Sequence, residues 1–166
     1  MQSINNPVFH HPFTMVVSGA TGTGKTEWLA KFIESATQII NPSSTSLFYC
    51  YGEENERTAK MAQNEVLTKL ISRSDSSVQP TSHSLPIRTF NGIPIDSEVK
   101  EEATNAGGHL LMVLDDLMVN IKASYLDVLF TRGSHNWGVS VILVTQHLFS
   151  KEIRTSRANA HYLCLM

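Results

Sequence analysis

The chain has 166 residues, 42% of them hydrophobic, which is enough for one domain with a substantial core and too few for two ordinary domains. Thirteen lysines and arginines oppose 15 aspartates and glutamates, so the formal net charge is −2. This balance excludes a protein whose overall positive field attracts nucleic acid or membranes, and any such contact must be local. Apolar runs are shorter than the roughly 18 residues of a membrane span, and the amino terminus lacks a signal-peptide pattern. We therefore expect a soluble intracellular protein.

The first predicted unit is a strand, a loop and a helix. Residues 1–12 are polar and rich in Asn, His and Pro, and we expect a tail or a strap that leads into the first strand. Phe13–Ser18 is a short apolar run with β-branched residues, and it ends at the glycine-rich stretch Gly19–Gly24. Apolar side chains then recur at helical spacing from Trp28 to Ala36.

The same alternation continues into the middle of the chain. Leu47–Tyr51 predicts a second strand, and apolar residues from Ala59 to Ile71 mark one face of a second helix. Residues 72–86 are rich in Ser, Thr and Pro and have few large apolar side chains, so we expect a flexible surface loop. Ile87–Phe90 predicts a short strand, and Asp96–Asn105 a short helix that ends before two glycines.

The last third predicts two further apolar strands after the one at Leu110–Leu114. Tyr125–Thr131 is interpreted as the end of a helix, and Val139–Thr145 and His161–Leu165 as strands. Strands that are continuously apolar indicate a sheet covered on both faces, and helical connections between them favour parallel pairing. We predict a single three-layer α/β domain over residues 1–166 with a mostly parallel central sheet.

One motif in the first unit carries a specific chemical meaning. The pattern GxxxxGK[ST] is matched in full between the predicted strand and helix, which is where a phosphate-binding P-loop must stand. Small residues let backbone N–H groups curl around phosphates, and the helix directs its positive dipole end at the same charge. We expect ATP with Mg²⁺ here and a fold of the RecA-like (ASCE) P-loop NTPase type; the alternative is a glycine turn without a ligand. The motif residues are Gly19, Ala20, Thr21, Gly22, Thr23, Gly24, Lys25 and Thr26.

Each residue at the end of the motif has an expected role. Lys25 should neutralise the β and γ phosphates, and the Thr26 hydroxyl should be a ligand of Mg²⁺.

Asp115 and Asp116 directly follow the apolar run Leu110–Leu114, which is the form of a Walker B strand. We expect Asp115 to orient the Mg²⁺ shell and Asp116 to polarise an attacking water; the alternative is that the two aspartates cap the next helix.

Later polar residues complete the expected site. Gln146 follows the strand Val139–Thr145, and a polar side chain there can sense the γ phosphate or hold a water molecule. Hydrolysis commonly needs an arginine, often from a neighbouring subunit, and Arg132, Arg154 and Arg157 are the candidates. The alternative for each arginine is an ordinary surface residue. A further alternative is that Lys151, Arg154 and Arg157 together bind DNA phosphates.

Four segments together resemble the viral genome-packaging ATPases of the FtsK and HerA superfamily, like those of poxviruses, adenoviruses and Polinton-type elements. The resemblance covers most of the chain. The segments are FTMVVSGATGTGKTEWLAKFI, the YGE at Tyr51–Glu53, the LLMVLDDLM at Leu110–Met118 and, most specifically, LFTRGSHNWGVSVILVTQHLF at Leu129–Phe149.

The resemblance implies a homo-oligomeric ring that threads double-stranded DNA into a preformed capsid while it hydrolyses ATP at subunit interfaces, with capsid or portal components as partners. It places Gln146 at the polar sensor of that family. The closing SRANAHYLCLM is similar to the segment before the family's final core strand, and relatives usually continue past it, so we expect a fragment or a shortened form. His147 stands where relatives often have Asn, and Asn136 and Trp137 where many are more basic, which implies weaker contact with DNA.

Two other functions remain compatible with the motifs. A small-molecule kinase shares the P-loop, but it normally needs an arginine-bearing lid and an acceptor pocket, and the carboxyl-terminal part has no obvious lid. A noncatalytic, ATP-dependent assembly module is the other alternative. Nucleotide-dependent association without turnover would favour that module.

Overall fold

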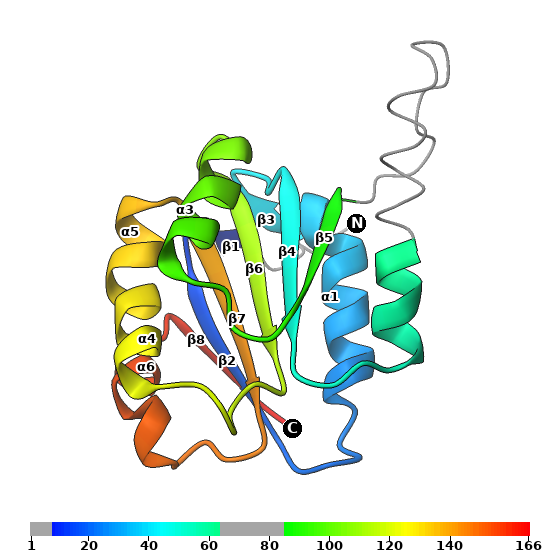
Figure 1. Ribbon diagram of the computed structural model, residues 1–166, viewed down its shortest axis with the longest axis vertical. Coiled ribbons are helices and arrows are strands. Elements are labelled where there is room, and N and C mark those ends of the chain that lie inside the picture. Colours follow the sequence, from blue (N-terminus) through cyan, green and yellow to red (C-terminus); the bar gives the residue numbers. More distant parts are fainter. Residues whose placement is uncertain (1–7, 64–84) are drawn as a thin grey trace, which may run out of the picture.

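The computed structural model describes residues 8–63 and 85–166 and has the expected three layers (Figure 1). A six-stranded sheet runs in the order β5-β4-β6-β7-β2-β8, and every neighbouring pair is parallel. The fold prediction is confirmed. The strands are β2 (Thr14–Ser18), β4 (Ser46–Tyr51), β5 (Ile87–Asn91), β6 (Leu110–Asp115), β7 (Val139–Thr145) and β8 (Tyr162–Leu165).

Helices cover both faces of the sheet (Figure 1). One face carries α1 (Lys25–Ile39) and the helical residues 56–63. None of the helices in the described residues has the length and apolar character needed to cross a membrane. The other face of the sheet carries the remaining helical elements. These elements are α3 (Asp96–Asn105), α4 (Ala123–Val128), the π-helical turn η1 (Leu129–Gly133), α5 (Ser134–Asn136), the 3-10 turn η2 (Lys151–Ile153) and α6 (Arg154–Ala158).

Two hydrophobic clusters, one on each face, explain why the strand sequences are continuously apolar. Along β6, Leu111 and Val113 pack toward α1, whereas Leu110, Met112 and Leu114 pack toward α3 and α4, and all five are fully buried. Successive side chains of a strand point to opposite faces, so a sheet covered on both sides needs an apolar residue at every position. The central sheet is therefore held by burial on both faces.

Three local differences from the sequence-based expectations stand out. Part of the predicted tail or strap at residues 1–12 is a short strand, β1 (Phe9–His10), which pairs in parallel with β3 (Ile40–Asn41). The expected helix end near Tyr125 belongs to a helical stretch that runs from α4 through the wide turn η1 into α5. The turn η2 and helix α6 had no sequence signal, because such short helices have no apolar period to detect.

Part of the expected middle region lies outside the described residues. The second predicted helix is present from residue 56 to residue 63. Its remainder, and the predicted flexible loop at 72–86 up to residue 84, lie in the undescribed range 64–84.

The strap before β2 is tied to the sheet through His11. Its Nε2 lies 2.9 Å from the carbonyl oxygen of Gly108 and its Nδ1 lies 2.6 Å from Ser140 Oγ. A carbonyl can only accept, so Nε2 carries a proton, and in the neutral ring Nδ1 then accepts from the Ser140 hydroxyl. The Ser140 oxygen in turn accepts from the backbone N–H of Phe13 at 3.1 Å. A neutral imidazole with its proton on Nε2 satisfies this network.

We predict that His11 makes the protein less stable in mild acid. Burial lowers the pKa of His11 from its ordinary 6.5; the hydrogen bond to the Gly108 carbonyl opposes this, and the nearby His109 reinforces it. Below about pH 6.5 the unfolded chain binds the proton more readily than the folded one, so stability is full above that pH and falls as pH drops toward the lowered pKa. The free energy of unfolding can be measured with urea at about pH 7.5 and at about pH 5.5. Between these two pH values it should fall less in His11→Gln than in the wild type. An equal loss in both proteins would exclude His11 as the cause.

Candidate functional site

The P-loop, the acidic pair and Gln146 lie at the carboxyl ends of three adjacent strands, β2, β6 and β7 (Figure 1). β7 lies between β2 and β6, with Ser18 paired to Thr145 and Asp115 paired to Val144. The residues that come next along the chain, Gly19, Gln146 and Asp116, therefore leave the sheet side by side. This is the crevice at the carboxyl ends of parallel strands, where open α/β sheets bind ligands.

The loop between β2 and α1 has the curvature that the motif predicts. Gly22 and Gly24 have φ values of 83° and 92°, a left-handed region that is strained for residues with a side chain. The Thr23 hydroxyl donates to the Ala20 carbonyl at 2.8 Å and closes the turn. Gly24 is the N-cap of α1, so the loop runs directly into the positive end of a 15-residue helix.

Lys25 is half-buried at the start of α1 and folds back over the loop. Its Nζ donates to the carbonyl oxygens of Ala20, at 2.8 Å, and Gly19. Thr26 follows in the first turn and is exposed. The ammonium group and the helix terminus are thus directed into the same space.

A cavity of about 470 Å³ opens between these elements. It gathers eight predicted residues from three separate parts of the sequence, namely the P-loop, the acidic pair and the end of β7. The eight are Thr21, Gly22, Gly24, Lys25, Thr26, Asp115, Asp116 and Gln146.

Asp115 is the last residue of β6 and is held by a neighbour that the sequence analysis did not select. The Tyr49 hydroxyl, on β4, donates a hydrogen bond to its Oδ2. Burial raises the pKa of Asp115, while the bond from Tyr49 and the cations Arg57 and Lys25 act in the opposite direction. Burial and the Asp115 carboxylate raise the pKa of Tyr49, so the phenol keeps its proton and fixes one carboxylate oxygen.

Asp116 leaves the strand through an unusual backbone conformation. Its φ is 54°, and it is the only described residue other than glycine with positive φ. A Cβ on Gly52, just after β4, would lie 2.4 Å from the Asp116 carbonyl oxygen, and the Gly52 N–H donates to the Asp115 carbonyl at 3.2 Å. A glycine at position 52 is therefore what lets the two strand ends approach. The result turns the exposed Asp116 out of the sheet at the rim of the cavity.

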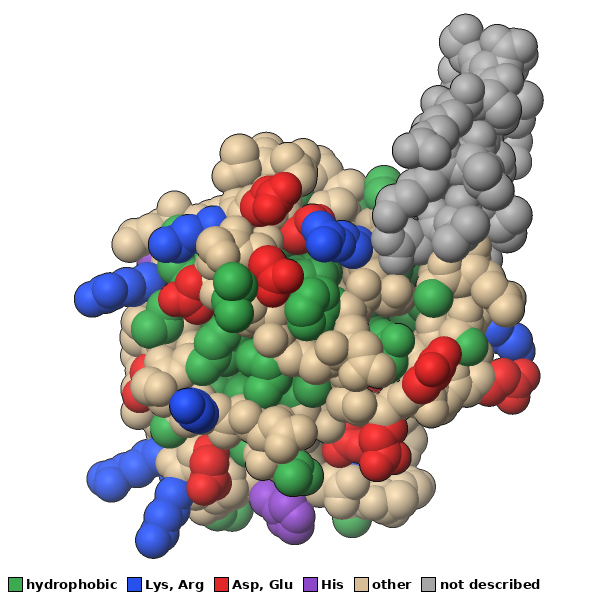
Figure 2. Space-filling model, in the orientation of Figure 1, with side chains coloured by type: hydrophobic (Ala, Val, Ile, Leu, Met, Phe, Trp, Pro, Cys, Tyr) green, Lys and Arg blue, Asp and Glu red, His purple; other side chains and the backbone are tan. Residues whose placement is uncertain are grey.

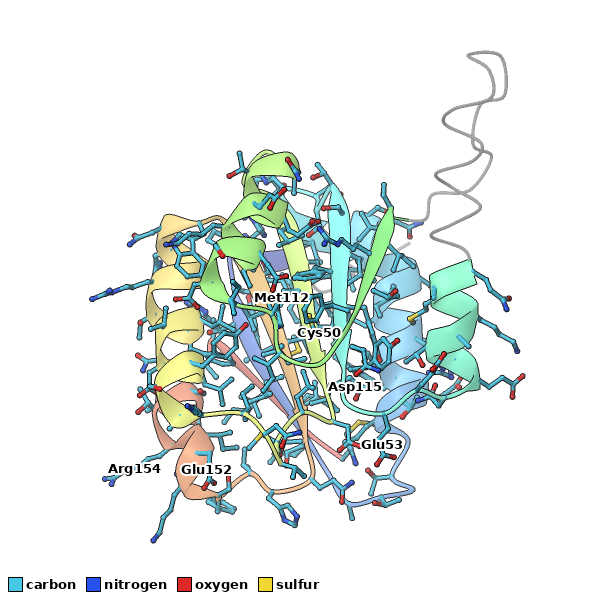
Figure 3. The ribbon with its side chains drawn as sticks, viewed as in Figure 1. Cys50, Glu53, Met112, Asp115, Glu152 and Arg154 are labelled. Atoms are coloured by element: carbon cyan, nitrogen blue, oxygen red, sulfur yellow. The ribbon has the colours of Figure 1, made fainter. Side chains whose placement is uncertain are left out.

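The three candidate arginines differ in their surroundings. Arg157 is half-buried; its Nη1 donates to the carbonyl of Leu148 at 2.5 Å, and its guanidinium lies 5.1 Å from the ring centroid of Phe149. These contacts hold Arg157 against the loop that follows Gln146. Arg132 and Arg154 are exposed and are not among the described residues that line the cavity. Figure 3 shows Arg154 projecting from the flank of the molecule, away from Asp115.

Two cavity residues lie just after β4, a segment to which the motifs gave no role. Asn55 precedes the helical residues 56–63, and its Oδ1 accepts from the backbone N–H of Thr58 at 3.0 Å, which is an N-cap bond. Arg57 lines the same cavity. The spacing of Asn55 and Thr58 could have indicated the cap, but nothing in the sequence connects Arg57 with α1.

No protein-family model matches the chain, and no curated protein matches it in sequence. Among solved structures, the chain is similar to a KaiC-like protein from the hyperthermophilic archaeon Pyrococcus horikoshii OT3. The TM-score is 0.55 at 16% identity, over 93% of this chain and 72% of the other. The fold is that of a RecA-like P-loop NTPase. At this identity the likeness concerns the fold alone, so what the site of this P-loop protein does must be argued from its own residues.

Proposed function

We propose that this protein binds ATP together with Mg²⁺ and hydrolyses it. The supporting observation is that a single cavity gathers the P-loop lysine and threonine, two consecutive acidic residues and a strand-end glutamine. This set supplies a cation for phosphates, oxygen ligands for a metal, a proton acceptor and a polar side chain that can orient water.

The donor set fits Mg²⁺, which prefers oxygen ligands and keeps several waters. The hydroxyl of Thr26 and the carboxylate of Asp115 would hold the ion, and Tyr49 occupies one carboxylate oxygen and so orients the other. When bound, the metal would neutralise charge on the phosphates. Lys25 and the N-terminal amides of α1 bind the same groups, Asp116 accepts a proton from the attacking water, and Gln146 orients that water.

We further propose that hydrolysis drives movement of double-stranded DNA in a viral genome-packaging motor built as a ring. The support is the resemblance carried by the P-loop segment, the acidic pair and Leu129–Phe149. Figure 2 shows Lys and Arg side chains projecting from the flank formed by α4, α5 and α6. An exposed arginine on that flank, Arg132 or Arg154, would reach the site of a neighbouring subunit, and capsid or portal components would be partners. Each of these finer assignments rests on the resemblance.

The experiment that tests the proposal is ATP turnover by the purified protein with and without double-stranded DNA at fixed salt and Mg²⁺. Fixed salt matters because contacts with DNA phosphates weaken steeply as ionic strength rises. Stimulation by DNA that is lost in Lys25→Ala would support the motor. Turnover that DNA does not change would leave an ATPase and contradict translocation. Binding of ATP without turnover in an assembled form would support the assembly module instead.

We predict that Tyr49→Phe weakens the response to Mg²⁺ more than it weakens nucleotide binding. The substitution keeps the buried ring and removes only the hydroxyl that holds Asp115. Loss of such a supporting hydrogen bond typically costs about tenfold to a hundredfold in metal affinity or activity. Titrating Mg²⁺ in the turnover assay should show a higher half-saturating concentration. Tyr125→Phe, which loses a hydroxyl on the other face of the sheet, is the matched control, and equal curves for both variants would contradict a role for Tyr49.

A further inference from the structure

Arg57 is the second residue of the helical stretch 56–63 and reaches across to the beginning of α1. Its Nη1 donates to the backbone carbonyl of Thr26, and its Nη2 lies 3.7 Å from a carboxylate oxygen of Glu27. The Arg57 side chain is 36% exposed, and both Arg57 and Glu27 line the cavity that holds the P-loop lysine. The guanidinium is therefore anchored one residue beyond Lys25, on the proposed Mg²⁺ ligand Thr26.

The guanidinium of Arg57 has spare hydrogen-bonding capacity. It carries five N–H donors in a fixed fork, and only the bond to Thr26 meets hydrogen-bond distance among the described residues. The approach to Glu27 at 3.7 Å is an ion pair without a hydrogen bond. Several donors are thus available to a ligand in the cavity.

The ion pair between Arg57 and Glu27 is also weak enough for a ligand to replace Glu27. The Glu27 side chain is 66% exposed, and ion pairs between exposed side chains contribute little because water screens them and ordering long side chains costs entropy. A phosphate offers the same fork two charged oxygens and forms shorter, stronger bonds. A bound nucleotide would therefore outcompete Glu27 for the guanidinium.

We propose that Arg57 is a second phosphate-binding cation of this site, supplied by the same chain, and that Glu27 competes with the nucleotide for it. This inference rests on the proposed nucleotide site and adds a residue to it. Lys25 and Arg57 are the two cations among the described residues that line the cavity, and they approach it from α1 and from the helix after β4. A pair of cations favours the more highly charged ligand, so Arg57 should select triphosphate over diphosphate.

The test is equilibrium binding by calorimetry, with Mg²⁺ present, of a nonhydrolysable ATP analogue and of ADP. Arg57→Ala should weaken the triphosphate by about tenfold or more and ADP by less than about threefold, because one charge-assisted fork to phosphate is lost. Arg57→Lys should fall between the two proteins, since it keeps the charge without the fork. Glu27→Gln should tighten the triphosphate by about twofold to fivefold, because the competitor is neutralised.

Lys60→Ala is the matched control, because Lys60 is an exposed cation on the same helical stretch that pairs with Glu56 at 2.9 Å. It should change neither affinity. If Arg57→Ala weakens both nucleotides equally, or neither, or if Glu27→Gln weakens the triphosphate, then Arg57 only fastens the helix to α1 and the inference is overturned.

Failure of this inference can be told apart from failure of the proposed function. Wild-type protein that hydrolyses ATP while Arg57→Ala keeps its preference for triphosphate would overturn the role of Arg57 alone. Wild-type protein that binds the analogue without any turnover of ATP would overturn hydrolysis, and the affinities would still decide on Arg57. Wild-type protein that binds neither nucleotide would overturn both.

Discussion

Lys25→Ala is expected to reduce ATP turnover by about a thousandfold, the scale on which a single preorganised donor to a charged transition state acts. The ammonium group is half-buried at the start of α1, and its present partners are the carbonyl oxygens of Gly19 and Ala20 in the P-loop. Alanine is an excellent helix former, so the helix and the loop should survive the change. The loss would then reflect the missing charge at the phosphates.

The measurement is steady-state release of phosphate at saturating ATP and Mg²⁺, together with thermal unfolding of each variant. Lys31→Ala is the matched control, because Lys31 lies on the same helix, is 72% exposed and makes a loose ion pair with Glu27 at 3.9 Å. It should retain turnover within about twofold, as expected for an exposed pair. Turnover by Lys25→Ala within about threefold of the wild type would mean that the cavity does not act on phosphates.

Much of the fold could be predicted because its signals are local. The P-loop lies between a strand and a helix, as its chemistry demands, and α3 has the predicted bounds Asp96–Asn105. The side chain of Glu98 accepts from the backbone N–H of Ile95 at 2.9 Å and fixes the start of that helix, while Gly107 and Gly108 follow its end. Caps, turns and apolar runs are properties of short segments, so a sequence reveals them directly.

The missing parts of the site depend on which strands are neighbours and on how they are paired. Tyr49 reaches Asp115 because β4 lies beside β6 and both residues point to the α1 face. In strands that are apolar at every position, the sequence pattern does not tell which residues share a face. The position of Arg57 beside the P-loop likewise depends on the packing of its helix near Thr26. The roles of Tyr49 and Arg57 are therefore set by tertiary contacts, which a local sequence pattern does not reveal.

Asp116→Asn is expected to preserve binding of Mg²⁺ and ATP while reducing turnover by about a hundredfold or more, the usual contribution of a general base. Asp116 has a φ of 54°, a conformation that Asn adopts as readily as Asp. The close approach of its carbonyl to Gly52 should therefore be unchanged. The amide keeps the size of the side chain and loses only the capacity to accept a proton.

The comparison with Asp115→Asn makes the prediction specific, because the two neighbours should fail in different ways. Asp115 is half-buried and bonded to Tyr49, so its substitution should weaken the dependence of nucleotide binding on Mg²⁺. Asp116 is exposed at the rim of the cavity, so its substitution should leave that dependence intact and slow a single turnover measured with enzyme in excess. If Asp116→Asn turned over ATP at the wild-type rate, the proton acceptor would have to be another group, and the second aspartate would serve the turn after β6 rather than the chemistry.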